Sequence, residues 1–200
     1  MSVATDSTGT MDRREVVKTL LAKRGDALLV TGLGSSTYDA GVYDHPNTFY
    51  LWGAMGAAAM IGLGLALAQP ARRVVVITGD GEMLMALGSL ATIGAQKPAN
   101  LGIVVLDNEL YAETGMQPTH TARGVDLAGM AKAAGFNVAQ TLRDEAQLDA
   151  AVGALYQAPG PLFFDVKVSS KRYPMSMRLR DGAHIKNRFR ENLLGQRAFD

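Results

Sequence analysis

Hydrophobic residues occur in blocks along this chain, and the blocks between residues 74 and 106 predict a β–α–β unit. Two β-branched runs, residues 74–78 and 101–106, are typical of strands that are buried on both faces. Residues 82–95 lie between them and are rich in Met, Leu and Ala, which favours a helix. Because such crossovers are right-handed, the two strands should be parallel, with their carboxyl ends at one edge of a sheet.

The pattern on either side of this unit predicts the rest of an α/β fold. A Gly- and Ala-rich helix that ends near Gln69 is expected to be buried or to lie at an interface, because it is too short for the ~20 apolar residues that a bilayer requires. We therefore predict three layers, a parallel sheet with helices on both faces. The other expected elements are helices over residues 12–23, 124–134 and 144–156, and strands over residues 27–31, 136–140 and 162–168.

The composition divides the chain into one domain and two short ends. Residues 1–10 are small and polar without the apolar core of a secretion signal, which predicts a disordered, cytoplasmic N-terminus. Residues 11–168 form the expected domain. Residues 169–200 are a basic tail with interleaved aromatic and Met residues, for which we favour packing on a partner subunit. Binding of nucleic acid or of an acidic substrate, or a solvated helix over residues 183–194, are the alternatives.

Charge and cysteine content exclude several functional classes. Lys and Arg total 20 against 19 Asp and Glu, so the net charge of +1 gives no global field to attract nucleic acid or an anionic membrane. The chain has no Cys, which excludes disulfides and an iron–sulfur cluster held by this chain alone.

Polar residues follow the two central predicted strands at their carboxyl ends. Asp80 and Asn108 would meet there and offer the hard oxygen ligands that Mg²⁺ prefers. Gly81 lets the backbone come close at the start of a helix, where free N–H groups favour an anion. A metal-bridged diphosphate fits both features, and a plain strand turn with an Asp cap is the alternative.

These residues resemble a known motif. Gly79-Asp80-Gly81, followed by Asn108, is similar to the thiamin diphosphate motif of decarboxylase-type thiamin enzymes. The resemblance implies that Mg²⁺ is held by the side chains of Asp80 and Asn108 and by the main-chain carbonyl of Leu110. It further implies cofactor contacts from Gly79, Gly81, Glu82, Tyr111, Ala112 and Glu113.

Two other segments resemble cofactor-binding parts of the same family. Gly34-Ser35-Ser36 is similar to the loop that donates hydrogen bonds to the diphosphate, although a hydroxyl-rich turn before a helix is the alternative. Met55 matches the apolar residue that props the cofactor into its bent form, and the Gly53 carbonyl matches the acceptor for the amino group of the cofactor. Core packing is the alternative for Met55.

Three titratable residues are candidates for proton transfer. His45 and His120 lie in segments predicted to border the cofactor, and either could act as an acid or base near pH 7. A structural role is the alternative for both. Glu113 is a candidate acid, although the resemblance places Thr114 at the position of the family's acidic residue. With Met55 and Gly53, we expect His120 and Glu113 to have catalytic roles.

The segment from Thr114 to Thr119 closely resembles its counterpart in sulfopyruvate and phosphonopyruvate decarboxylases. The implied function is that of a β subunit of a two-subunit thiamin diphosphate- and Mg²⁺-dependent decarboxylase, which converts a 3-sulfo- or 3-phosphono-pyruvate-like 2-oxo acid to the aldehyde and CO₂. In this family the activating Glu comes from a pyrimidine-binding domain, for which this chain has no room, so a hetero-oligomer with an α subunit is expected. The alternatives are a β subunit of a 2-oxo acid oxidoreductase or carboligase and a non-catalytic α/β binding module.

Overall fold

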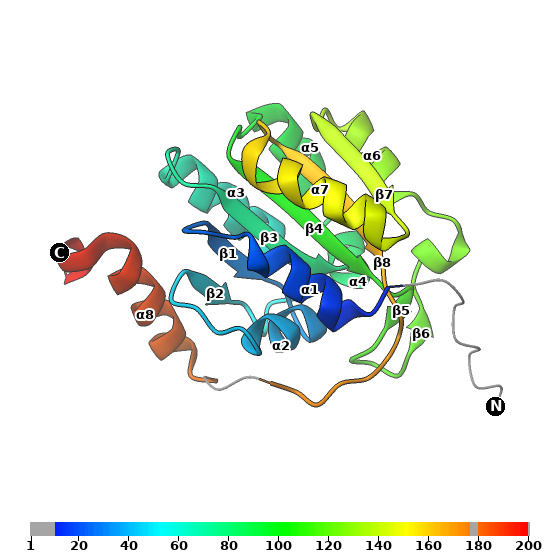
Figure 1. Ribbon diagram of the computed structural model, residues 1–200, viewed down its shortest axis with the longest axis horizontal. Helices are drawn as coiled ribbons and strands as arrows, with labels where there is room; N and C mark the ends of the chain where they lie inside the picture. Colours follow the sequence, from blue (N-terminus) through cyan, green and yellow to red (C-terminus); the bar gives the residue numbers. More distant parts are fainter. Residues whose placement is uncertain (1–10, 177–179, 200) are drawn as a thin grey trace.

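The computed structural model describes residues 11–176 and 180–199, so the predicted disorder of residues 1–10 lies outside the described residues. Six parallel strands form one sheet, which confirms the predicted parallel sheet, although only five of these strands were predicted (Figure 1). Their order in space is β2 (Thr48–Tyr50), β1 (Leu28–Thr31), β3 (Val74–Gly79), β4 (Leu101–Asp107), β8 (Leu162–Lys167) and β7 (Val138–Leu142).

Helices cover both faces of the sheet, which confirms the predicted three-layer α/β fold. The side chains of the central strands are buried on both faces because alternate residues enter two separate cores. One core contains Val75 and Val104, and the other contains Val74 and Ile103. The first is covered by α1 (Arg13–Ala22), α2 (Ser35–Gly41) and α7 (Glu145–Gln157), and the second by α3 (Ala58–Ala68), α5 (Gly88–Gln96) and α6 (Leu127–Ala133).

The helix predicted over residues 82–95 is two helices. The first, α4 (Asp80–Met85), ends at Ala86, and α5 begins at Gly88. The break changes the chain direction so that Leu90 and Ile93 of α5 reach the core. Helix propensity alone did not predict this break. Beyond it, α5 packs closely against the end of α6, where a Cβ at Gly94 would lie 1.8 Å from the Ala134 carbonyl oxygen.

Three further predictions needed correction. The polar, turn-rich sequence after Asn108 predicts no regular element, but the segment contains an antiparallel pair, β5 (Leu110–Tyr111) and β6 (Gln117–Pro118). Strand β2 was not predicted, because its three residues are too few to show a period. The helix predicted from residue 124 begins only at Leu127, where Asp126 caps it by accepting a hydrogen bond from the Gly129 N–H.

After β8, the C-terminal segment passes α1 and α2 and leads to α8 (Gly182–Leu194), which lies beside β2 (Figure 1). Tyr173 lies under the Arg14 guanidinium, 4.2 Å from the ring centroid. In α8, Phe189 packs edge-on against Phe49 with ring centroids 5.7 Å apart, and Arg188 donates two hydrogen bonds to Asp44. The predicted helix is therefore present and packs on its own chain rather than being fully solvated. Packing of the tail on a partner stays a prediction.

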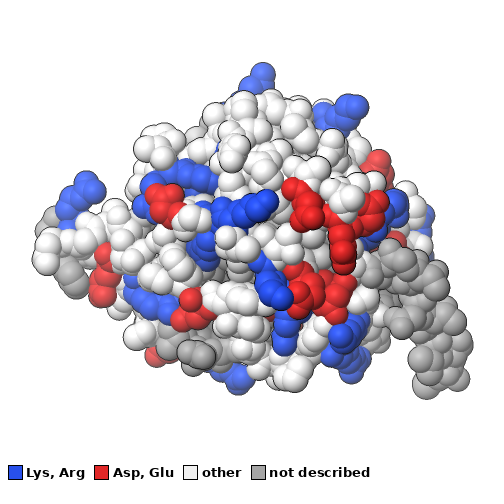
Figure 2. Space-filling model, in the orientation of Figure 1, with Lys and Arg blue, Asp and Glu red and all other residues white. Residues whose placement is uncertain are grey.

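None of the helices in the described part of the chain has the length and apolar character needed to cross a bilayer. On the face shown in Figure 2, basic and acidic side chains are interspersed.

Candidate functional site

The candidate site lies at the carboxyl edge of the sheet, between β1 and β3. The chain leaves β1 toward β2 on one side, while β3 and β4 lie on the other, so the loops after β1 and β3 diverge and leave a crevice. A cavity of about 140 Å³ occupies this crevice. It is lined by Arg13, Leu33, Gly34, Ser35, Ser36, Met55, Gly79, Asp80, Gly81, Glu82, Leu106, Asn108, Leu110, Tyr111, Ala112, Glu113 and Thr114.

The structure brings together at one cavity all of the candidate site residues except Gly53, His120 and His45. Gly53 is exposed in the loop between β2 and α3, and His120 is exposed just before the short 3₁₀ helix Thr121–Arg123. Neither lines the cavity. Their cofactor and proton-transfer roles therefore stay predictions. Arg13, which sequence reasoning did not select, does line the cavity.

His45 lies elsewhere, which corrects the expectation that its segment borders the site. It precedes β2 and so lies at the amino edge of the sheet, opposite the cavity. Its Nδ1 accepts a hydrogen bond of 3.1 Å from the Asn47 N–H, and burial lowers its pKa. These contacts support the structural role.

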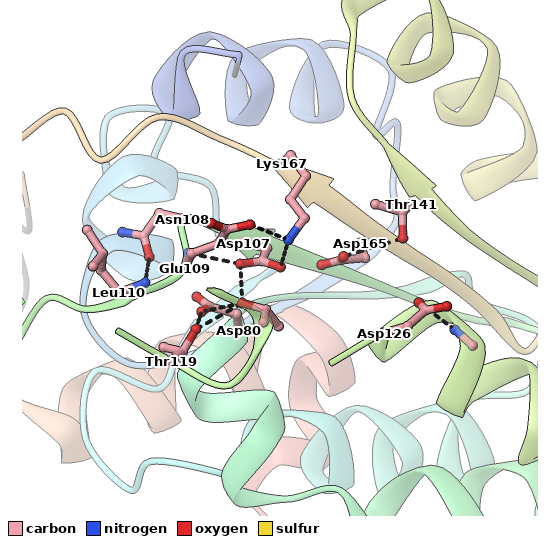
Figure 3. Close-up of polar contacts among 12 residues, drawn as sticks. Asp80, Asp107, Asn108, Glu109, Leu110, Thr119, Asp126, Thr141, Asp165 and Lys167 are labelled. Atoms are coloured by element: carbon pink, nitrogen blue, oxygen red, sulfur yellow. Dashed lines mark hydrogen bonds and ion pairs between the residues drawn. The ribbon is translucent and has the colours of Figure 1, made fainter. Parts of the chain in front are cut away.

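Asp80 is the first residue of α4, and its carboxylate is hydrogen-bonded to residues outside that helix (Figure 3). Its Oδ2 accepts a hydrogen bond of 2.6 Å from the Thr119 hydroxyl. The Thr121 hydroxyl lies 3.4 Å from the same oxygen and 2.9 Å from Oδ1 of Asp107. Burial and the nearby charge of Asp107 raise the pKa of Asp80. A cation beside Asp80 would lower this cost.

The main chain after Asp107 turns so that Asn108 and Leu110 face the cavity. Asn108 Oδ1 accepts a hydrogen bond of 3.1 Å from the Leu110 N–H, an Asx-type turn. Glu109, between them, has a positive φ of 64°. Asp80, Asn108 and Leu110 thus line one cavity. A carboxylate, a carboxamide and a main-chain carbonyl are the oxygen groups that Mg²⁺ prefers. No cluster of three or more His, Cys, Asp or Glu that could hold a metal occurs within the described residues.

Two glycines keep the cavity open for an anion. A Cβ at Gly81 would lie 2.6 Å from the Tyr111 ring. Gly34 has a φ of +70°, and a Cβ there would lie 2.5 Å from Oε1 of Glu113. Both positions therefore favour glycine. The main chain there carries no side chain and lies near Ser35 and Ser36, whose hydroxyls fit a diphosphate.

The side chain of Glu82 accepts hydrogen bonds from three separate segments at the cavity wall. Its buried carboxylate accepts hydrogen bonds from the Leu33 N–H at 2.9 Å through Oε2 and from the Gly56 N–H at 3.1 Å through Oε1. Oε2 also accepts from the Thr78 hydroxyl at 2.7 Å. Burial raises its pKa, an effect that these hydrogen bonds partly offset. Glu82 thereby fixes the ends of β1 and β3 to the loop that carries Met55.

Met55 lies in that loop, before α3 begins at Ala58. Its side chain is 36% exposed, and its Cε lies 3.7 Å from where a Cβ on Gly81 would be. Met55 therefore belongs to the cavity wall rather than to the core, which is the arrangement expected of a cofactor prop.

We expect Glu82→Gln to loosen the Met55 loop. One carboxamide oxygen cannot accept from both Leu33 and Gly56, which bind different carboxylate oxygens, so one buried N–H would be left unpaired at a cost of about 1–3 kcal/mol. Trp52, the single Trp of the chain, lies in this loop and reports on it through acrylamide quenching of its fluorescence. Quenching should increase in Glu82→Gln. Thr78→Val, which removes only the hydroxyl donor, should leave it unchanged, and equal quenching in all three proteins would contradict the assignment.

A buried ionic cluster that sequence reasoning missed lies against the turn after Asp107 (Figure 3). Lys167 Nζ lies 2.6 Å from Oδ2 of Asp107 and 3.0 Å from Oε1 of Glu109. Burial lowers the pKa of Lys167, but its hydrogen bonds to the two carboxylates outweigh this effect and raise it. Asp165 is also buried, and its Oδ1 has no hydrogen-bond partner among the described residues. Burial and the Asp107 charge raise the pKa of Asp165.

The raised pKa of Asp165 predicts a pH-dependent stability. The folded chain holds a proton on Asp165 that the unfolded chain releases at an ordinary value near 3.8, so the free energy of unfolding should fall as the pH rises from that value to the raised one. Asp165→Asn carries no such proton and should be more stable than the wild type at pH 7, by at least about 1 kcal/mol. Urea unfolding between pH 5 and 8 measures this. Asp149→Asn, on the exposed side of α7, is the control, and parallel curves for Asp165→Asn and the wild type would refute the prediction.

The part of the chain that forms the sheet and the cavity is similar in sequence to known proteins. Residues 32–166 match the family described as "Thiamine pyrophosphate enzyme, C-terminal TPP binding domain". The chain is 39% identical over 186 residues to a protein of Methanothermobacter thermautotrophicus named sulfopyruvate decarboxylase subunit beta, covering 92% of this chain and 97% of the relative. It is 42% identical over 137 residues to a phosphonopyruvate decarboxylase of Streptomyces viridochromogenes, covering 68% of this chain and 34% of that enzyme.

Solved structures show the same fold. A structure described as that of a thiamin diphosphate-dependent enzyme from Mycobacterium smegmatis matches with a TM-score of 0.69 and 26% identity over 82% of this chain. A Rhodococcus jostii 4-hydroxybenzoylformate decarboxylase matches with a TM-score of 0.67 and 18% identity over 84% of this chain, which supports the fold alone. The chain spans about a third of the length of both. This chain therefore belongs to the thiamin pyrophosphate enzyme family, as a domain of its C-terminal, cofactor-binding type.

Proposed function

We propose that this chain is the β subunit of a two-subunit, Mg²⁺-dependent thiamin diphosphate enzyme that decarboxylates a 3-sulfo- or 3-phosphono-pyruvate-like 2-oxo acid. The observation that carries the proposal is the convergence of Asp80, Asn108, Leu110 and Gly81 on one cavity at the switch point of the sheet. The extent of similarity to a protein named as a decarboxylase β subunit supports the subunit assignment, because 97% of that relative is covered.

The residues of this chain would bind and orient the cofactor. Asp80, Asn108 and the Leu110 carbonyl would hold Mg²⁺, and the Ser35 and Ser36 hydroxyls would donate hydrogen bonds to the diphosphate. Met55 would support the bend of the cofactor, and the Gly53 carbonyl would accept a hydrogen bond from its amino group. When bound, thiamin diphosphate takes up the electron pair that remains as CO₂ leaves the substrate.

The hairpin after Asn108 would face the 2-oxo acid. Glu113 lines the cavity and could hold or deliver a proton there, with Tyr111 and Ala112 forming the adjacent wall. His120 lies outside the cavity of this chain, on an exposed turn. Its role in the proposal is proton transfer at the mouth of the site once a partner subunit covers it.

Exposed apolar side chains around the cavity loop support a partner subunit. Trp52 is 41% exposed and Met85 is 67% exposed. The Met55 loop and α4 are adjacent, since a Cβ on Gly56 would lie 3.5 Å from the Met85 side chain. Exposed apolar groups gathered beside the cavity favour a protein–protein interface. We propose that a pyrimidine-binding α subunit covers this region and supplies the activating Glu.

The experiment is a calorimetric titration of thiamin diphosphate into the chain, with and without Mg²⁺, repeated with the pyrimidine-binding chain encoded beside it. We expect Mg²⁺-dependent binding that becomes tighter with the partner. CO₂ release by the complex should then be faster from sulfopyruvate or phosphonopyruvate than from pyruvate. Absence of binding in every combination would refute the cofactor assignment, and equal turnover of pyruvate would refute the substrate assignment.

A further inference from the structure

The cavity carries an imbalance of charge. Three of its lining residues are acidic, Asp80, Glu82 and Glu113, and Arg13 is the sole Lys or Arg among the described residues that line it. A Mg²⁺ ion bound to Asp80 would neutralise only part of the charge on a diphosphate, because Asp80 is itself an anion. A bound diphosphate therefore needs a further cation in the cavity wall, and Arg13 is in a position to supply it.

Arg13 is held rigidly at the first position of α1. Its side chain is 7% exposed, and its Nε lies 2.5 Å from Oδ2 of Asp39. Its Nη1 donates a hydrogen bond of 3.3 Å to the main-chain carbonyl of Lys171. Two of the donors of the guanidinium are thus committed to the protein. A planar group fixed in this way loses little further freedom when it binds a phosphate.

The ion pair at Asp39 leaves one positive charge in excess. Asp39 is fully buried in α2, and its second oxygen, Oδ1, lies 3.0 Å from Nε of Arg14. Two guanidinium groups therefore share one carboxylate. Arg14 directs its other hydrogen bond to the carbonyl of Pro174 and stacks on Tyr173, and it does not line the cavity. The excess charge is available to the cavity through Arg13.

We propose that Arg13 binds the terminal phosphate of the cofactor, with Asp39 and the Lys171 carbonyl as its positioning groups. The inference rests on the proposed function. Through its ion pair with Asp39, Arg13 is fixed to α2. This helix begins with Ser35 and Ser36, which we assign to the diphosphate, whereas Met55, which we assign to the bend of the cofactor, lies in a different loop. Arg13 also lies outside residues 32–166, so the family match does not include it.

The test compares two ligands that differ by one phosphate. Thiamin diphosphate and thiamin monophosphate are each titrated by calorimetry, with Mg²⁺, into the full-length wild type, Arg13→Met, Arg13→Lys and Arg14→Met. We expect Arg13→Met to weaken binding of the diphosphate by roughly 10- to 100-fold, the usual range for a lost charged hydrogen bond, and binding of the monophosphate much less. Arg13→Lys should recover part of the loss. Arg14→Met, which removes the same charge from the same carboxylate outside the cavity, should keep the wild-type ratio of the two dissociation constants.

The ratio of the dissociation constants for the diphosphate and the monophosphate within one variant does not depend on the fraction of folded protein. Partial misfolding of Arg13→Met would therefore not mimic the expected result. An unchanged ratio in Arg13→Met overturns the inference and leaves the proposed function standing. An equal loss in Arg14→Met also overturns it. Failure of the wild type to bind either ligand overturns the inference together with the proposed function.

Discussion

Replacing Asp80 with alanine is expected to abolish the Mg²⁺-dependent binding of thiamin diphosphate while the chain stays folded. Asp80 is the single carboxylate among the three oxygen ligands that we assign to the metal, so its loss removes the only negative charge of the set. We expect the affinity for the cofactor in Mg²⁺ to fall by roughly 100-fold or more, beyond what the loss of an outer-shell contact causes. Calorimetric titration with and without Mg²⁺ measures both the loss and its dependence on the metal.

The fold should survive this change because the Asp80 charge is costly in the chain without metal. Asp80 is 2% exposed, and burial and the charge of Asp107 both raise its pKa. Alanine removes this cost. The hydroxyls of Thr119 and Thr121, which lie 2.9 Å apart, can still bind each other. We therefore expect the Tm of Asp80→Ala without metal to equal or exceed that of the wild type.

Two further variants test whether the effect is specific to the Asp80 carboxylate. Asp80→Asn keeps an acceptor for the Thr119 hydroxyl and should bind the metal weakly, between the wild type and Asp80→Ala. Asp165→Asn alters a carboxyl group of the same buried cluster that does not line the cavity, and it should keep Mg²⁺-dependent binding. Wild-type cofactor affinity in Asp80→Ala would contradict the metal assignment.

The sequence predicted the parts of this site that follow from local pattern. Buried parallel strands are continuous apolar runs, and their carboxyl ends share an edge, so the meeting of Asp80 and Asn108 could be inferred from the residues alone. The positions of Ser35 and Met55 required resemblance to a family in addition. In both cases the signal lies within a single segment of the chain.

The parts that could not be predicted join segments distant in the sequence. Arg13 reaches the cavity because Asp39 holds it from another helix, and no local pattern distinguishes it from the neighbouring Arg14. Glu82 reads as a helix residue beside a motif, yet its carboxylate binds the Leu33 and Gly56 N–H groups, which are 49 and 26 positions away. Such contacts appear only once the tertiary fold places the loops side by side.

Replacing Lys167 with methionine is expected to destabilise the chain strongly. Lys167 is 8% exposed and is the cation bound to both Asp107 and Glu109. Methionine keeps most of the side-chain volume but leaves the fully buried Asp107 without its partner, a type of change that costs about 3–5 kcal/mol. A corresponding fall in Tm of roughly 6–20 °C is expected for a chain of this size. Urea and thermal unfolding at pH 7.5 measure the effect.

The same change should have a characteristic pH dependence and a specific rescue. The raised pKa of Lys167 stabilises the wild type throughout the range below the ordinary lysine value of 10.5, and this contribution is lost only as the pH rises through the raised value. Without Lys167, the fully buried Asp107 carboxylate has no cation beside it. Asp107→Asn in the Lys167→Met background should recover stability at pH 7.5, because the amide removes the buried charge, whereas Asp107→Asn alone should destabilise the chain by leaving Lys167 without its buried partner. Additive effects of the two substitutions would show that Lys167 does not stabilise the chain through Asp107.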